Sequence, residues 1–295
     1  MLDDIVATPF ETLGNKDSLI MFPIATRSLG WQKADRGFEL FGSHKAIIRI
    51  LYGAPRVLNV VSNTYNVVHN RELFSAIENT MTTLISPSGL AGVKIIDSVA
   101  HFGRMCFRQY IFPNLLCSIG AKSSIGFRVV VSNAYGGASI RLLTGAIEFY
   151  CSNGMITGDF TSTYHRHTRG LQIDRIGEHI KSGLIAFTNE PVKWARWCEK
   201  TVTREETMAL FTEIASSPRQ AEKFINRWEV EAADRGPTVW SVYSTLTNYA
   251  SHNTGDFSIR SSSIDNDSVA DTMLKREIDV RKWTEHPMFK EMTAK

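Results

Sequence analysis

The sequence predicts an α+β fold, in which an antiparallel β-sheet meander packs with helices and a helical C-terminal region follows. Residues 91–152 carry successive apolar and β-branched segments of strand length, and a glycine-rich turn joins the last two. An amphipathic helix pattern precedes them at residues 71–84, and helix start signals recur after residue 200. Strands in one block and helices in another are typical of this fold class.

The chain of 295 residues is long enough for one large domain or two smaller ones. We expect an N-terminal arm with the first strands at 1–56, an α+β core with the antiparallel sheet at 57–175, and a helical region at 176–295. Only one strand is predicted in the first region, at Lys45–Gly53.

The helix predicted at 71–84 has apolar residues at helical spacing, and Asn70 is expected to cap it. The apolar face consists of Leu73, Ile77, Met81 and Leu84. The predicted strands of the sheet are 91–102, 103–112, 123–134 and 140–152, with Gly136 and Gly137 in the turn before the last strand.

Alternation along these strands predicts one face that mixes cations with aromatic rings. A period of two places Arg104, Arg108 and Tyr110 on the same face of the second strand. In the next strand, Arg128 stands opposite the apolar residues Phe127 and Val129. We expect this face to be open to solvent.

The C-terminal region is predicted to be helical. Thr203 and Glu206 have the spacing of a capping box, and Ser217 with Pro218 marks a second helix start. Gly236 and Pro237 interrupt the chain before another helix. A polar surface loop is expected at 251–270, followed by a short terminal helix.

Charge favours a polyanionic partner, and hydropathy argues against a membrane protein. Residues 27–169 hold 15 Lys and Arg against 7 Asp and Glu, a net charge of +8, which favours an acidic polymer as partner. No apolar run reaches the length of about 18 residues that a membrane span needs. The chain begins MLDDIVATPF, with acids where a signal peptide has bases, so we expect a cytoplasmic protein without a membrane partner.

Enzymatic chemistry is not predicted, and neither a metal nor another cofactor is expected. His165 and His167 alternate as metal ligands on a strand do, but only Cys151 and Asp159 are nearby donors. The glycines near Lys122 do not have the spacing that a phosphate-binding loop requires. The Gly-x-Ser-x-Gly motif that holds a nucleophilic serine does not occur. The cysteines are widely spaced and form no Cys-x-x-Cys pair.

A flexible single strand is bound by cations that follow its phosphates and by rings that stack on its bases. We therefore predict phosphate contacts for the arginines, base stacking for the tyrosines and polar contacts for the histidines of the basic block. The set is Arg104, Arg108, Arg128, Arg141, Arg166 and Arg169, with Tyr110, Tyr135 and Tyr164, and with His165 and His167. Cys151 and Asn153 are expected to be structural, the asparagine in a tight turn with Gly154.

Three segments resemble a phage and plasmid protein family that is known only as domain of unknown function 932. They read SNTYNVVHNRELFSAIEN, VVVSNAYGGASIRLLTGAIEFYCSNGMI and PTVWSVYSTLTNYASH, and together they span roughly residues 57–252. The block Cys151-Ser-Asn153 is the most specific part of the resemblance. Membership implies a mobile-element setting and brings no known reaction.

The order of a helix, antiparallel strands and further helices also resembles the core of single-strand annealing proteins such as RecT and Red beta. That resemblance implies non-enzymatic binding of single-stranded DNA, with strand annealing by a ring or filament of copies, in phage or plasmid recombination or replication. The alternative is a protein-interaction module, an inhibitor or assembly factor for host machinery. Such a module predicts exposed apolar side chains and little affinity for nucleic acid. A metal-dependent hydrolase that uses His165 and His167 is a third reading.

Overall fold

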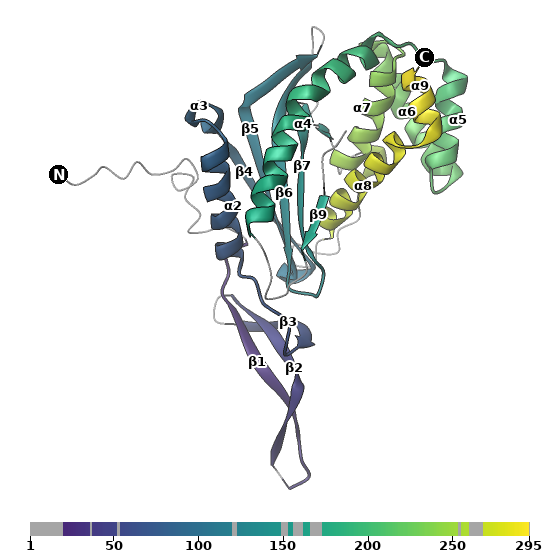
Figure 1. The fold of residues 1–295 in the computed structure, drawn as a ribbon. Coiled ribbons are helices and arrows are strands. Elements are labelled where there is room, and N and C mark those ends of the chain that lie inside the picture. The colour runs from purple at the N-terminus through teal and green to yellow at the C-terminus, as the bar shows by residue number, and fades with distance from the viewer. Residues whose placement is uncertain are drawn as a thin grey trace, which may run out of the picture.

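The computed structural model describes two antiparallel sheets and the helices around them (Figure 1). The smaller sheet projects from one end of the molecule, and the larger sheet lies among the helices (Figure 1). The described residues are 20–35, 37–51, 54–119, 123–148, 153–155, 162–165, 173–252, 255–259 and 268–294.

The small sheet, which we call the arm, has the strand order β1-β2-β3. Its strands are β1 (Ile24–Gln32), β2 (Phe38–Leu51) and β3 (Ala54–Ser62). The strand predicted at Lys45–Gly53 lies mostly within β2, and the prediction of a single strand before residue 56 is wrong, because β1 and the start of β3 also precede it. The boundary expected at 56/57 falls inside β3.

Helix α2 (Asn70–Leu84) follows the arm and buries Leu73, Ile77 and Met81 of its predicted apolar face, whereas Leu84 at its last position is 36% exposed. Asn70 does not cap it, because His69 occupies the N-cap position. The buried Asn70 amide instead donates a hydrogen bond to the Ile20 carbonyl at 2.7 Å and accepts one from Asn133 at 2.7 Å. The asparagine therefore ties the helix to the chain before the arm and to the large sheet.

The large sheet is the predicted antiparallel meander, in the order β4-β5-β6-β7-β8, with β9 also paired to β7. Its strands are β4 (Lys94–Ala100), β5 (Met105–Ile119), β6 (Ser123–Ala134), β7 (Ile140–Glu148), β8 (Asn153–Met155) and β9 (Ser162–His165). Gly137 has a φ of +86° in the turn before β7, as its position predicts. The prediction of a turn at Asn153 is wrong, because this residue lies in β8, where it pairs with Glu148 of β7.

The C-terminal region is helical, and the predicted capping box at Thr203 and Glu206 is present. Ser217 caps α6 with Pro218 at its first position, and Gly236 follows its last residue. Part of the predicted loop at 251–270 is a 3₁₀ turn, η3 (Gly255–Phe257). The helices after α2 are α3 (Pro87–Leu90), α4 (Ile173–Glu199), α5 (Arg204–Ile214), α6 (Pro218–Arg235), α7 (Val239–Ser251), α8 (Val269–Thr284) and α9 (Pro287–Ala294).

Helices cover both faces of the large sheet. On one face, the Phe127 ring contacts Phe112 of β5 and Phe187 of α4, and Arg108 reaches Glu78 of α2. On the opposite face, Arg128 reaches Glu277 of α8. The sheet is therefore the middle layer of three, and α4 runs along its strands beside α2 in Figure 1. Alternate residues of its strands point to two interior surfaces rather than to one interior and one solvent face.

Helix α4 approaches the sheet closely at Gly183. A Cβ atom at this position would lie 2.2 Å from Oγ1 of the buried Thr144 on β7. We expect Gly183→Ala to lower the free energy of unfolding by about 1–3 kcal/mol, measured by chemical denaturation, because the helix must move away from the sheet. Gly177→Ala in the same helix is the control, since its Cβ would lie 3.2 Å from Cγ2 of Thr80 on α2, a wider approach than at Gly183. Equal stability of the two variants would contradict the expectation.

Candidate nucleic-acid interface

Arg108 lies in the interior, with 1% of its side chain exposed. Its Nε donates to Asp97 Oδ1 at 2.8 Å, its Nη1 donates to Glu78 Oε1 at 2.9 Å, and the guanidinium lies over the Phe74 ring. The Tyr110 hydroxyl donates to the same Glu78 oxygen at 2.8 Å. Two residues predicted to face a nucleic acid thus hold α2 against the sheet.

Burial and the neighbouring charges shift the pKa values of Arg108 and Glu78 in this network. Burial lowers the pKa of Arg108, but the hydrogen bond to Asp97 and the neighbouring negative charges outweigh burial and raise that pKa above its ordinary value. Burial raises the pKa of Glu78, while the Tyr110 hydroxyl and the Arg108 guanidinium lower it in part. A cation in the interior is stable only with such partners.

Arg128 and Tyr135 are buried as well. Arg128 is ion-paired with Glu277 and donates to the Gln109 amide oxygen at 3.1 Å. The Tyr135 hydroxyl accepts a hydrogen bond from the backbone N–H of Asn70 at 3.2 Å. Like Arg108 and Tyr110, these residues do not reach solvent, so none of the four belongs to the interface that we propose below.

The other residues predicted for the interface are not buried in this network, and they lie in separate places. Arg104 is exposed, and its side chain lies against Gly136 in the turn before β7. Arg141 is half-buried on β7, where it pairs with Tyr164 of β9, and His165 follows in the same strand. The side chains of Tyr164 and His165, and all of Arg166, His167, Arg169 and Cys151, lie outside the described part of the chain. No group of metal-ligating side chains occurs among the residues that the structure describes.

The arm carries exposed aromatic rings that the sequence analysis did not single out. Trp31 is 54% exposed, Phe38 64% and Phe41 48%. Trp31 pairs with Glu39 and Leu29 pairs with Phe41, so Trp31 and Phe41 share one face of the β1–β2 hairpin as diagonal neighbours. Phe38 lies on the other face, with its ring across Gly30. The missed signal was Asp35-x-Gly37, a turn sequence between two aromatic residues.

Arginines without a carboxylate partner gather at the arm and its base. Arg108, Arg128, Arg204, Arg227 and Arg235 are all paired with acids. In the described part of the chain, no ion pair joins an acid to Arg27, Arg49, Arg56, Arg71 or Arg104. Of these, Arg27, Arg56, Arg71 and Arg104 are exposed. The buried Arg108 and Arg128, and Arg235 with 6% of its side chain exposed, are thus neutralised by carboxylates. The exposed cations of the arm and its base are not paired with an acid of the described residues.

The base of the arm contains a strained segment, η2 (His101–Gly103). His101 has a φ of +52° and Phe102 a φ of +62°, in the left-handed region that costs non-glycine residues energy. This geometry places the Phe102 ring 3.6 Å from the guanidinium carbon of Arg56 on β3. The backbone of Arg104, which follows directly, accepts a hydrogen bond from the Tyr135 N–H at 2.8 Å. The segment thereby places Arg56 of β3 and Arg104, which precedes β5, at the same end of the arm.

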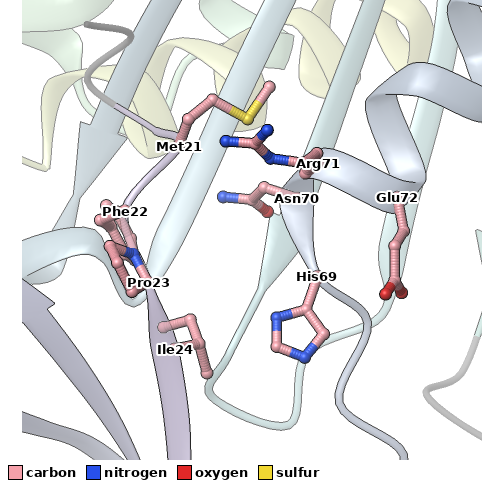
Figure 2. Close-up of a pocket in the computed structure, with 8 residues that line it drawn as sticks. All are labelled: Met21, Phe22, Pro23, Ile24, His69, Asn70, Arg71 and Glu72. Carbon is pink, nitrogen blue, oxygen red and sulfur yellow. The ribbon is translucent and has the colours of Figure 1, made fainter. Parts of the chain in front are cut away.

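A cavity of about 380 Å³ opens where the arm meets α2 (Figure 2). Figure 2 shows the Arg71 guanidinium beside Met21 and the Asn70 amide pointing toward the chain that enters β1, with His69 below them. Both polar atoms of the Asn70 side chain already have hydrogen-bond partners within the protein. Arg71 is the exposed cation that lines this cavity.

The part of the arm nearer the core has an aliphatic face. Ile48 pairs with Val57 and Ala46 pairs with Val60, so these side chains share one surface. Val57 is 58% exposed and Val60 is 47% exposed. Exposed apolar surface of this kind is typical of protein contacts.

Within the described residues, no helix has the length and apolar character required to cross a membrane.

Comparison with known proteins places residues 57–279 in one family. The match covers more than half of the chain, begins within β3 and ends within α8, so β1 and β2 lie outside it. No curated protein and no solved structure matches the chain. The protein belongs to the family described as domain of unknown function DUF932.

Proposed function

We propose that this protein binds single-stranded DNA through the arm and its base, without catalysing a reaction. The observation that carries the proposal is the combination of exposed Trp31, Phe38 and Phe41 with arginines that are not ion-paired to any carboxylate of the described residues. Rings of this kind accept unstacked bases, and the neighbouring guanidiniums follow the phosphates. The proposed interface consists of Arg27, Arg56, Arg71 and Arg104 with Trp31, Phe38, Phe41 and Phe102.

A single strand suits this surface better than a duplex does. The bases of a duplex are stacked on each other, so exposed rings on a β-ribbon gain little from them. An extended strand can lie along the β1–β2 hairpin and stack on Trp31 and Phe41 in turn. Strand annealing by a ring or filament of copies, in phage or plasmid recombination within a host cytoplasm, is the finer form of the proposal.

The proposal predicts a steep dependence on salt. The logarithm of single-strand affinity should fall with the logarithm of salt concentration by about 0.7 per phosphate neutralised. The variant Arg27→Gln/Arg56→Gln/Arg104→Gln should bind more weakly and reduce the slope by about 2, measured by fluorescence anisotropy with a labelled oligonucleotide. Unchanged affinity and slope in this variant would rule out the arm as the phosphate-binding surface.

Arg196→Gln is the matched control for that measurement. Arg196 is exposed on α4, outside the proposed interface. It should keep the affinity and the slope of the original chain, because only cations near the bound phosphates release counterions.

A second candidate function is docking of a protein partner. The exposed aliphatic face at Ile48, Val57 and Val60 favours it, since aliphatic side chains offer bases no ring to stack on. This function predicts weak oligonucleotide binding that is indifferent to Trp31 and Phe41.

A further inference from the structure

A cleft of about 320 Å³ lies between α8 and the face of the large sheet that carries Arg128. Strand register builds its floor, because Ile96 of β4 pairs with Gln109 of β5, and Gln109 pairs with Val130 of β6. Residues directly opposite each other on neighbouring strands stand on the same face of a sheet. Helix α8 provides the facing wall. Its lining residues follow helical spacing and are Ala270, Met273, Leu274 and Glu277.

The lining of this cleft is mostly apolar and carries no net charge. The buried residues Phe107, Val130 and Leu274 belong to it. Arg128 and Glu277 are the only charged side chains among its described lining residues, and they are paired with each other. A charged ligand would therefore lose its hydration without gaining an opposite charge. The cleft suits an uncharged ligand with apolar faces.

The Arg128 guanidinium holds two polar side chains of the lining side by side. Its Nη1 donates to Gln109 Oε1 at 3.1 Å, and its Nη2 donates to Glu277 Oε2. Because the guanidinium is planar and rigid, these two bonds fix the amide and the carboxylate as neighbours. Within the described residues, the amide nitrogen of Gln109 and Oε1 of Glu277 have no hydrogen-bond partner. A donor group and an acceptor atom therefore remain for a ligand.

These two groups define the polar edge that a ligand must present. The carboxylate oxygen of Glu277 accepts a hydrogen bond and the amide nitrogen of Gln109 donates one, so the ligand needs a donor next to an acceptor. Uracil has a ring N–H beside a carbonyl, and adenine has an amino group beside a ring nitrogen. Proteins that bind an unpaired base read this edge with hydrogen bonds and hold the ring between apolar side chains. A purely aliphatic ligand would leave both protein groups unpaired.

We propose that the cleft between α8 and the large sheet binds a nucleobase, with Gln109 donating to the acceptor and Glu277 accepting from the donor of its pairing edge. The volume lies at the lower end of the range of about 300–1,000 Å³ that small-ligand sites have. The base has two possible sources, a free nucleoside or an unpaired base of an oligonucleotide. The described lining includes no residue of the arm, so this proposal does not rest on the function proposed for the arm.

Isothermal titration calorimetry of the full chain with uridine and with adenosine tests the site. Saturable binding of at least one nucleoside is expected, and ribose should not bind. The methylated forms 3-methyluridine and N6,N6-dimethyladenosine lack the donor of the pairing edge. They should bind more weakly by about fivefold or more, because the buried Glu277 carboxylate stays without a donor. Absence of saturable binding by both nucleosides, or equal binding of the methylated forms, would overturn the proposal.

Two variants test the same site from the protein side. Gln109→Leu removes the amide at similar size and should weaken nucleoside binding about fivefold, whereas Gln220→Leu removes a half-buried amide from α6 and should not. Ala270→Leu should fill the cleft and weaken binding by about tenfold or more, whereas Ala209→Leu changes an exposed position of α5. Circular dichroism checks that each variant is folded. Nucleoside binding by Gln109→Leu and Ala270→Leu that equals their controls would contradict this site.

Oligonucleotide titrations identify the source of the base and separate the cleft from the arm. Single-strand affinity that falls in Gln109→Leu would indicate an unpaired base of the bound strand. Single-strand affinity that stays constant while nucleoside binding falls would indicate a free nucleoside. Trp31→Ala should keep nucleoside binding, so either proposal can fail without the other. Loss of nucleoside binding in Trp31→Ala would place the nucleoside on the arm and overturn the cleft as its site.

Discussion

Arg108→Met is expected to lower the free energy of unfolding by about 3–5 kcal/mol. Methionine fills a similar volume but leaves Asp97 and Glu78 without their shared cation, and both carboxylates are largely buried. The cost of an uncompensated buried charge is much larger than the loss of one hydrogen bond. Urea denaturation followed by circular dichroism measures the change.

Two further variants show whether buried charge is the cause. Glu78→Gln/Asp97→Asn/Arg108→Met removes the stranded carboxylates and should recover part of the lost stability. Arg204→Met breaks the exposed pair with Glu229 and should cost about 1 kcal/mol or less. A loss in Arg108→Met no greater than the loss in Arg204→Met would show that the α2 network contributes little.

This result also bears on function. A variant that lacks Arg108 would lose the proposed DNA binding through unfolding, even though this side chain does not reach solvent. Tests of the interface therefore use exposed residues of the arm and its base.

Trp31→Ala and Phe41→Ala are each expected to weaken single-strand affinity by about 1–3 kcal/mol, because each removes a ring on which one base stacks. The double variant should lose close to the sum only if the two rings bind successive bases independently. Anisotropy titrations with a labelled oligonucleotide, at one fixed salt concentration, measure the affinities.

Exposed positions on the arm give matched controls. Val57→Ser and Val60→Ser change the aliphatic face and should leave DNA affinity unaltered. All of these positions are roughly half exposed or more, so stability should change little in any variant. Equal affinities for Trp31→Ala and the original chain would remove base stacking from the proposal and favour a protein partner instead.

Local patterns in the sequence predicted local structure well. The apolar spacing of α2, the capping box of α5 and the glycine turn before β7 all depend on residues within a few positions of each other. The arm was underestimated because β1 has no clean alternation: its exposed apolar residues and its polar residues are intermixed. When neither face of a strand is covered, nothing requires apolar and polar residues to alternate along it.

The sequence by itself determined the fold class, the order of α2 and the strands β4 to β7, and which residues of β5 share a face. It did not determine what covers that face. Only the tertiary structure decided that Arg108 meets Asp97 and Glu78, 11 and 30 positions away, and that Arg128 meets Glu277, 149 positions away. Strand periodicity sets the side on which an arginine stands, but long-range packing sets whether that side holds water or a carboxylate. For this reason Arg108 and Arg128 became interior, on opposite faces of the sheet, and exposed arginines for which the described residues provide no acidic partner lie at the arm and its base.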